Sequence, residues 1–145
     1  MEDVVRAGDT FTLDPAMTES TAREMWLLPP PGRTVVATAG DGAVLGTAKM
    51  NPNQAGPGAH VASASYMVAV AHRGRGVGRA LVAHTIDRAR EAGYRGIQFN
   101  AVAATNRGAV ALYEALGFAV VGTIPGGFCH PAAGYVDLLV MYRAL

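Results

Sequence analysis

The residues best suited to chemistry lie in one segment, residues 68–81, which reads Val-Ala-Val-Ala-His-Arg-Gly-Arg-Gly-Val-Gly-Arg-Ala-Leu. A short apolar strand leads there into a loop with alternating glycines, and the loop leads into a helix. Because glycine has no Cβ, the backbone N–H groups of such a loop can turn toward one point and approach a bulky anion. The helix start adds unpaired N–H groups and the positive end of its dipole. The segment therefore predicts a phosphate site, most simply for a diphosphate.

Charge and spacing narrow the ligand of this loop. Arg73, Arg75 and Arg79 supply forked donors that suit phosphate oxygens. A Walker loop needs a lysine after its last glycine, but the single lysine of the chain, Lys49, lies far away. A dinucleotide fingerprint needs a third small residue where Leu81 stands. A glycine-rich surface turn between a strand and a helix remains the alternative interpretation.

The run Arg-Gly-Arg-Gly-Val-Gly at 73–78 fits the pattern [R/Q]-x-x-G-x-[G/A] and resembles the pyrophosphate loop of the GNAT acetyltransferases, which bind acetyl-coenzyme A. A second segment, residues 96–118, resembles the other signature of that family: a strand, an asparagine, then a helix with Leu-Tyr and a closing Gly-Phe. The matching positions are Asn106, Ala109, Leu112, Tyr113, Gly117 and Phe118. The resemblance covers residues 33–145, and two motifs in the right order are more specific than either alone.

Composition agrees with a single globular domain. The chain has 145 residues, of which 50% are hydrophobic and 16% are charged, so it can bury one sizeable core and is not disordered. A net charge of +1 gives no general attraction for nucleic acid. The lone Cys129 excludes an internal disulfide and permits a reducing compartment. We expect neither a membrane span nor a signal peptide and therefore a cytoplasmic protein, while eleven arginines against one lysine hint at a bacterial gene.

Periodicity and turn residues predict the elements that position these motifs. Apolar patterns and breakers indicate a helical N-terminal piece that ends before Pro29, then strands, helices and a hairpin turn at 40–42. The expected strands are 33–39, 43–50, 60–70, 96–102, 118–123 and 135–142, and the expected helices are 2–7 (the tail of a first helix), 76–92 and 107–116. Residues 51–58 are expected to form a turn-rich connection.

This order predicts the fold class α/β, a single domain over residues 1–145 with a mixed, mostly antiparallel sheet flanked by helices. The family resemblance implies that two central strands, 60–70 and 96–102, splay apart around the pantetheine arm of the coenzyme. GNAT domains usually open with a strand, and we expect none before Gly8 in this chain. Since an exposed sheet edge invites pairing, we expect a homodimer.

The resemblance also implies roles for individual residues. The coenzyme contacts are expected at Met67, Val68, Ala69, Val70, Arg73, Gly74, Arg75, Gly76, Val77, Gly78, Arg79, Ala80, Asn106, Ala109 and Tyr113. The backbone N–H of Val68 would stabilise the oxyanion, and Tyr113 would serve as the acid for the leaving thiolate. The alternative for Tyr113 is a core aromatic, and for Asn106 a helix N-cap.

The base and the acceptor are less constrained. Residues 61–70 contain no carboxylate or histidine, so a water chain, His60, His130 and Asp137 all stay open as bases. An acetyl-enzyme on Cys129 is disfavoured because the family transfers directly, and no metal is expected. Asn100, Asn106 and His130 are the candidate acceptor contacts, and carboxamides suit a small amino acid.

Several runs resemble the GNAT subgroup that includes proline-analogue (azetidine-carboxylate) N-acetyltransferases: Gly8-Asp9-Thr10-Phe11, Phe99-Asn100 with Thr105-Asn106, and Gly134 to Asp137 with Tyr142-Arg143. That resemblance implies an amino acid or a toxic analogue as the small-molecule acceptor. Two other function classes stay open. One is a catalytically degenerate acyl-coenzyme A sensor or partner module, and the other is a flavin or nicotinamide enzyme.

Overall fold

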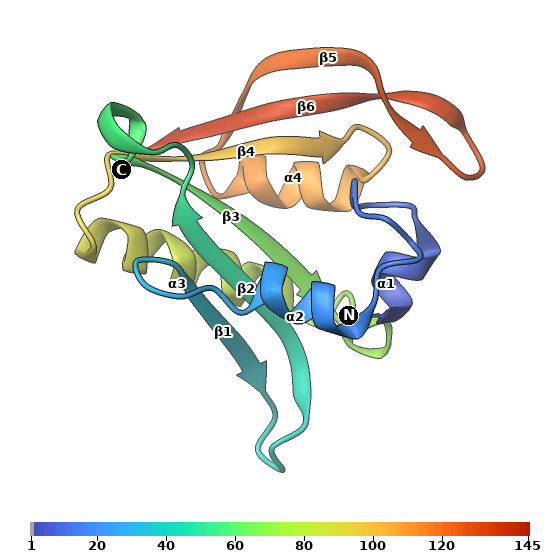
Figure 1. The fold of residues 1–145 in the computed structure, drawn as a ribbon, viewed down its shortest axis with the longest axis horizontal. Coiled ribbons are helices and arrows are strands. Elements are labelled where there is room, and N and C mark those ends of the chain that lie inside the picture. The colour runs from blue at the N-terminus through green and yellow to red at the C-terminus, as the bar shows by residue number, and fades with distance from the viewer. Residues whose placement is uncertain (1) are drawn as a thin grey trace. The chain divides into compact units, whose positions relative to one another are not determined.

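A computed structural model describes residues 2–145 (Figure 1). Its helices are α1 (Glu2–Ala7), α2 (Glu19–Trp26), α3 (Val77–Glu91) and α4 (Arg107–Ala115), with short 3-10 turns η1 (Gly56–Gly58) and η2 (Val70–His72). Its strands are β1 (Arg33–Thr38), β2 (Val44–Pro52), β3 (Val61–Val68), β4 (Gly96–Ala103), β5 (Ala119–His130) and β6 (Gly134–Ala144). The sheet order is β1-β2-β3-β4-β6-β5, with antiparallel pairs β1–β2, β2–β3 and β5–β6 and a parallel pair β3–β4. The predicted α/β class with a mixed sheet is confirmed.

The chain divides into two compact units, each with its own internal packing. One unit holds Thr18–Ile97 with the last two residues, and the other holds residues 2–17 with Gln98–Arg143. The boundary falls within β4, so the first unit ends with the start of that strand.

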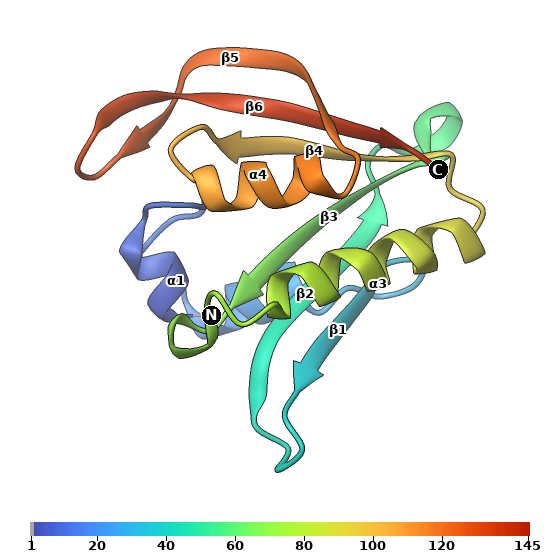
Figure 2. The ribbon, with the colours of Figure 1, turned by 180° about the vertical axis from the view of Figure 1, so that it is seen from behind.

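In the unit of residues 18–97, β1, β2 and β3 form an antiparallel layer between two helices. Helix α2 lies on one face and α3 on the other (Figures 1 and 2). The α3 face is closed by apolar residues at helical spacing, Leu81, Val82, Ile86 and Ala89, all buried. On the α2 face, Trp26 Nε1 donates to Thr47 Oγ1 at 3.0 Å.

In the unit that contains residues 98–143, α4 packs against β4 through aromatic rings. Phe99 of β4 stacks on Phe118 with ring centroids 4.3 Å apart, and Tyr113 of α4 lies 4.5 Å from Phe99. A second cluster joins Ala103 to Phe128 and Leu138 of the β5–β6 hairpin. These contacts hold α4 and the hairpin on β4.

Helices α3 and α4 begin and end within one residue of the expected bounds, 76–92 and 107–116. Gly76 is the N-cap of α3, and Gly93 follows its end with φ +80°. Asn106 caps α4 by accepting a hydrogen bond from the N–H of Ala109 at 3.3 Å. Gly8 follows the end of α1 with φ +61°, and the predicted helix over residues 2–7 is confirmed.

Several expected strand bounds were wrong, and β6 runs two residues past the expected end at 142, to Ala144. The strand expected over 60–70 is β3 (Val61–Val68), because the chain turns at η2, where the N–H of His72 donates to the Ala69 carbonyl. Strand β2 continues to Pro52, into the expected connection, because Pro52 pairs with Ala62 of β3.

Strand β5 runs on past residue 123 to His130, where turn residues had suggested a loop. A pairing irregularity between Ile124 and Phe128 absorbs Pro125, Gly126 and Gly127. The Asp137 carboxylate of β6 accepts the Gly126 N–H at 3.0 Å and so holds this irregular segment on its partner strand.

Over residues 2–145, no helix combines the length and apolar character needed to cross a membrane. The first element of the described chain is the helix α1, not a strand.

Candidate functional site

The loop at the start of α3, residues 73–80 (here the glycine loop), has the backbone geometry of an anion cradle. Gly74 and Gly76 have φ values of +73° and +82°, which side-chain-bearing residues rarely adopt. The first helical hydrogen bond of α3 runs from the Ala80 N–H to the Gly76 carbonyl. The N–H groups of residues 77–79 therefore precede the helical ladder at the positive end of a fifteen-residue helix.

The arginines of the glycine loop surround this helix start with positive charge. Arg73, Arg75 and Arg79 are all exposed. Within the described residues none of them joins an ion pair, and Arg75 lies 3.2 Å from His72 Nδ1. Oriented N–H groups and arginines together make this part of the unit electropositive, as a diphosphate site requires.

Strand β3 leads into the loop and directs one backbone group outward. Val68 faces Gly46 of β2, and the hydrogen bond from the Ala69 N–H to the Leu45 carbonyl identifies this as a non-hydrogen-bonded pair. The N–H and C=O of Val68 therefore point away from β2. The parallel ladder of β3 with β4 contains only two pairs, Val61 with Gly96 and Ala62 with Ile97.

The four residues expected to line the pantetheine arm differ in their surroundings. The side chain of Met67 is buried, and its backbone faces Thr47 of β2. Ala69 uses its N–H on Leu45, and Val70 lies in η2 with 57% of its surface exposed. Of the four, Val68 is thus the residue whose N–H the β2 pairing directs away from the ladder.

Tyr113 lies in the aromatic cluster of the other unit. Its ring contacts Phe99 and lies 6.0 Å from Phe118, and burial raises the pKa of its phenol to about 12. At neutral pH the hydroxyl therefore keeps its proton and acts as a donor. The ring of Tyr113 thus takes the core position that the sequence allowed.

The carboxamides expected to contact ligand belong to this same unit and have structural partners. The Asn106 side-chain oxygen is the N-cap of α4, so the structural alternative for this residue is realised, and Ala109 supplies the N–H that it accepts. Asn100 is exposed on β4 and accepts a hydrogen bond from Gln98 Nε2 at 2.8 Å. These interactions fix the orientation of both amides.

The two histidines considered as bases, His130 and His60, are poorly arranged for that role. His130 Nδ1 accepts the N–H groups of Ala132 and Ala133, each at 3.1 Å, which assigns the proton of the neutral ring to Nε2. His130 therefore has no spare lone pair in this arrangement. His60 Nδ1 must donate to the Pro57 carbonyl at 2.9 Å, leaving Nε2 as an acceptor, but eight strand steps separate it from Val68, about 26 Å.

Asp137, the remaining candidate base, accepts the Gly126 N–H and serves the hairpin. The described residues also contain no group of three or more His, Cys, Asp or Glu side chains that could hold a metal ion.

Gly46 is a residue of the site that the sequence interpretation passed over. A Cβ at Gly46 would stand 2.8 Å from the Met67 carbonyl oxygen and 3.1 Å from Val77 Cγ1. The absence of that Cβ lets the first residue of α3 approach β2 closely, which positions the glycine loop. An isolated glycine within a strand pattern is the signal that could have revealed it.

Comparison with known proteins decides the family. The model of the acetyltransferase (GNAT) family matches residues 6–118. The chain belongs to the GNAT acetyltransferase family. The match covers both signature segments, and membership identifies this GNAT protein as an acyltransferase of the N-acetyltransferase type.

Three proteins are similar to this GNAT chain over most of its length. A GCN5-related N-acetyltransferase from Kribbella flavida is 55% identical, with a TM-score of 0.96 over 99% of this chain and 87% of that one. The N-acetyltransferase aca1 of Schizosaccharomyces pombe is 26% identical over 94% of this chain and 72% of its own length. A phosphinothricin acetyltransferase from Sinorhizobium meliloti, solved in complex with AcCoA, is 26% identical with a TM-score of 0.70, over 77% of this chain and 60% of that one.

Proposed function

We propose that this protein is a single-domain, acetyl-coenzyme A-dependent N-acetyltransferase that moves the acetyl group directly to the amine of a small molecule, with an amino acid or analogue favoured. The observation that carries the proposal is the glycine loop, where positive φ at Gly74 and Gly76 opens α3 amid three exposed arginines. The family match and the AcCoA complex of the Sinorhizobium meliloti relative support this choice of coenzyme.

The coenzyme's diphosphate binds the N–H groups of residues 77–79 and the arginines of the glycine loop. Its pantetheine arm runs along β3, where Val68 directs its backbone away from β2. Backbone pairing of this kind needs no particular side chain, which fits the uncharged sequence of β3. The family resemblance adds Asn106, Ala109 and Tyr113 to the proposed coenzyme contacts.

In the reaction, the amine nitrogen attacks the thioester carbonyl carbon, the C–N bond forms, the C–S bond breaks, and the amine loses one proton. The Val68 N–H donates to the carbonyl oxygen as it becomes negative, and a single such donor contributes a factor of about 10² or more. The leaving sulfur departs as a thiolate and takes up a proton to become the free thiol.

Tyr113 acts on that sulfur as a hydrogen-bond donor. Its pKa of about 12 lies well above the ordinary thiol value of about 8.5. Complete proton transfer from the phenol to the thiolate is therefore uphill, whereas a hydrogen bond to the developing charge is favourable. The thiolate then takes up its proton from solvent and becomes the free thiol.

The amine proton also leaves to solvent. His60 is distant from Val68, and His130 has its Nδ1 occupied, so water relays the proton or the acceptor arrives as the free amine. The acceptor's polar groups contact Asn100 and Asn106, whose amides are held in place by Gln98 and by the α4 cap. In this proposal His130 contributes its Nε2–H to binding, not to base catalysis.

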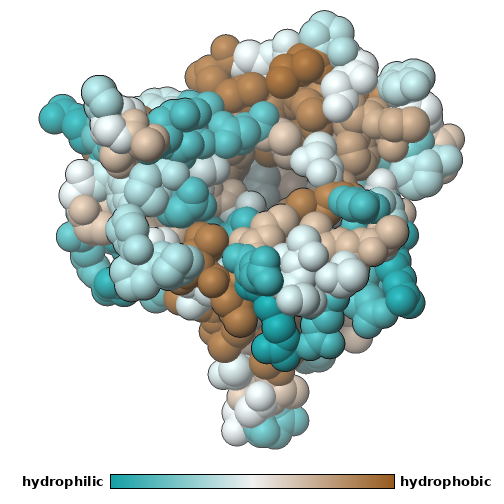
Figure 3. Space-filling model, viewed as in Figure 1, coloured by the Kyte–Doolittle hydropathy of each residue, from teal (hydrophilic) through white to brown (hydrophobic). Residues whose placement is uncertain are grey.

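The proposal includes self-association through the end strand β5. Val121 and Ile124 on β5 and Tyr135 on β6 are exposed, and Figure 3 shows apolar side chains gathered over this hairpin. A long apolar edge strand pairs readily with a second copy of the chain. We also place the protein in the cytoplasm of a bacterium, in keeping with its single cysteine and its arginine-rich composition.

The test is a release assay for free coenzyme A thiol with a panel of amines led by amino acids and proline analogues, beside a thermal-shift assay with acetyl-coenzyme A. We expect stabilisation by the thioester and accelerated thiol release with at least one small amino acid. Stabilisation without release on any amine would favour the sensor alternative. Protection by flavin or nicotinamide, and none by the thioester, would reject the proposal.

A further inference from the structure

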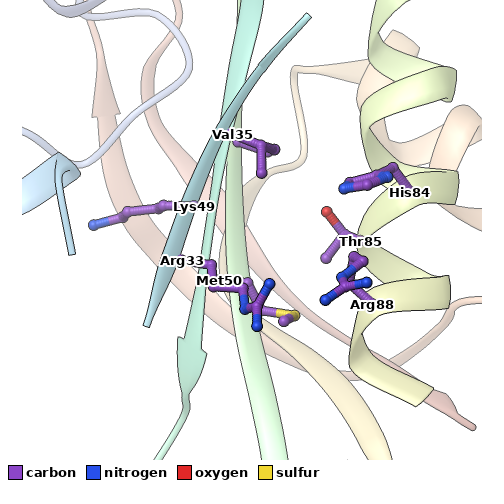
Figure 4. A pocket seen from close by; sticks show the side chains of 8 residues that line it. Arg33, Val35, Lys49, Met50, His84, Thr85 and Arg88 are labelled. Carbon is purple, nitrogen blue, oxygen red and sulfur yellow. The ribbon is translucent and has the colours of Figure 1, made fainter. Parts of the chain in front are cut away.

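A second feature of residues 18–97 lies on the α3 face of the sheet and is separate from the glycine loop. A small pocket, here the basic pocket, opens between α3 and strands β1 and β2 (Figure 4). It is lined by Arg33, Val35, Ala48, Lys49, Met50, His84, Thr85 and Arg88. His84 lies seven residues beyond the start of α3, about 10 Å along the helix axis from the anion cradle.

The charges of the basic pocket have one sign. Figure 4 shows Arg33 reaching from β1 toward α3 and Arg88 reaching from α3 toward the sheet, with His84 on the same side of the strands. No carboxylate lines the pocket. Arg88 pairs with Glu91 on its own helix, but within residues 2–145 no ion pair involves Arg33. Arg33 therefore brings to the pocket a positive charge that no ion pair of the described residues offsets, which favours an anion there.

Lys49 does not contribute its charge here. Its ammonium donates to the Met25 carbonyl at 2.9 Å on the α2 side, and Figure 4 shows the side chain pointing away from α3. Thr85 likewise offers no donor, because its hydroxyl donates to the Leu81 carbonyl. The polar groups that can face a ligand are therefore the two arginines and His84.

The floor of the basic pocket is apolar. Val35 of β1 pairs with Ala48 of β2, and Arg33 pairs with Met50, so these side chains share the α3 face of the sheet. The cavity volume is about 50 Å³. Since one water-sized group needs roughly 10–15 Å³ of such space, a body of about four heavy atoms fits, with its charged end at the arginines.

We infer that the basic pocket binds a small organic anion, in which a carboxylate or phosphate lies between Arg33 and Arg88 and a short apolar body rests on Val35, Ala48 and Met50. Forked guanidinium donors suit both headgroups. The inference is independent of the acetyl-transfer proposal, because none of these residues belongs to the glycine loop.

The test uses propionate as the probe, with propanol, propylamine and inorganic phosphate for comparison. Each is titrated at constant ionic strength, and binding is followed by NMR through the Met50 methyl and the amides of residues 33–35 and 84–88. We expect saturable shifts confined to these signals with propionate, weaker ones with phosphate, which lacks an apolar body, and none with propanol or propylamine. Shifts spread evenly over the exposed arginines, or equal shifts with propanol, would overturn the inference.

Single substitutions distinguish the loss of a binding charge from a loss of folding. Arg33→Gln and Arg88→Gln are each expected to weaken propionate binding about tenfold, the loss of one charge-assisted contact. Arg90→Gln is the matched control, because Arg90 lies on α3 outside the pocket and pairs with Asp87. The propionate affinity of this variant should stay within about twofold of the wild-type value. Unchanged amide spectra elsewhere show that each variant folds, and equal weakening by all three variants would contradict a built site.

Discussion

Gly46 of β2 lies directly against Val77, the first residue of α3. A Cβ built at Gly46 would approach Val77 Cγ1 to 3.1 Å and the Met67 carbonyl oxygen to 2.8 Å. The contact joins the strand pair β2–β3 to the start of the helix that carries the glycine loop. Because Gly46 has no side chain, the start of α3 can lie close to the sheet at this point.

Gly46→Ala tests that contact. The Met67 carbonyl belongs to the backbone and cannot yield, so the added methyl should push α3 outward and cost about 1–3 kcal/mol of stability. The displaced helix start should also weaken acetyl-coenzyme A binding, measured by calorimetry. Gly40→Ala is the control, since the Cβ site of Gly40 is open within the described residues and its φ is not positive. Equal affinity in the two variants would show that the contact does not position the loop.

Gly76→Ala separates backbone strain from binding. Gly76 lies at the start of α3 with φ +82°, and Gly93 follows the end of the same helix with φ +80°. At both glycines the space that a Cβ would occupy has no non-neighbouring atom of the described chain within 4 Å. Each alanine variant should lose about 1–2 kcal/mol, the cost of a left-handed L-residue. The two sites lie about 25 Å apart along α3. Calorimetry should therefore show weakened coenzyme binding in Gly76→Ala alone; a matching loss in Gly93→Ala would assign the effect to general destabilisation.

Tyr113→Phe tests the hydrogen bond to the leaving sulfur. The ring contacts with Phe99 and Phe118 survive this change, so the fold should be retained. We expect kcat to fall about 10- to 100-fold, the contribution of a hydrogen bond to a charged group, with the KM for acetyl-coenzyme A little changed. Tyr135→Phe, on a side chain that is 81% exposed, should leave both constants unaltered. A wild-type kcat in Tyr113→Phe would return this residue to a purely structural role.

The alkaline stability of the protein should also report on Tyr113. Its pKa rises from the ordinary 10.0 to about 12 on folding, so the unfolded chain loses the phenol proton first as the pH increases. The unfolded state then binds fewer protons, and the stability contribution present below pH 10 is lost between pH 10 and 12. Chemical denaturation across this range should show a steeper decline in wild type than in Tyr113→Phe. Parallel curves would contradict a buried phenol.

Lys49 should change the stability of the protein in the opposite direction as the pH rises. Desolvation lowers its pKa below the ordinary 10.5, while the Met25 carbonyl and the Trp26 ring, 5.3 Å from Nζ, hold the ammonium. The folded protein releases this proton before the unfolded chain does, so this group adds stability as the pH rises from the folded pKa toward 10.5. Because Lys49 is the only lysine, one NMR signal of its side chain reports the pKa. A midpoint at or above 10.5 would show that burial does not govern this group.

The family and the local geometry of the glycine loop could be predicted from the sequence. Gly76, Gly93 and Asn106 fixed helix ends because only glycine tolerates positive φ without strain and because a carboxamide accepts a helix N–H. These preferences act between residues close in the chain, so one sequence reveals them. The two GNAT signatures combine such preferences in a fixed order, which made the resemblance specific.

Features that depend on partners distant in the sequence could be read only from the folded chain. The direction of the Val68 N–H follows from its register against Gly46, and the extension of β5 to His130 follows from its pairing with β6 and from the Asp137 contact. The presence of Arg33 and Arg88 in the lining of one pocket likewise had no local signal. Pairing register, burial and charge proximity join residues far apart in sequence, and folding is what brings them together.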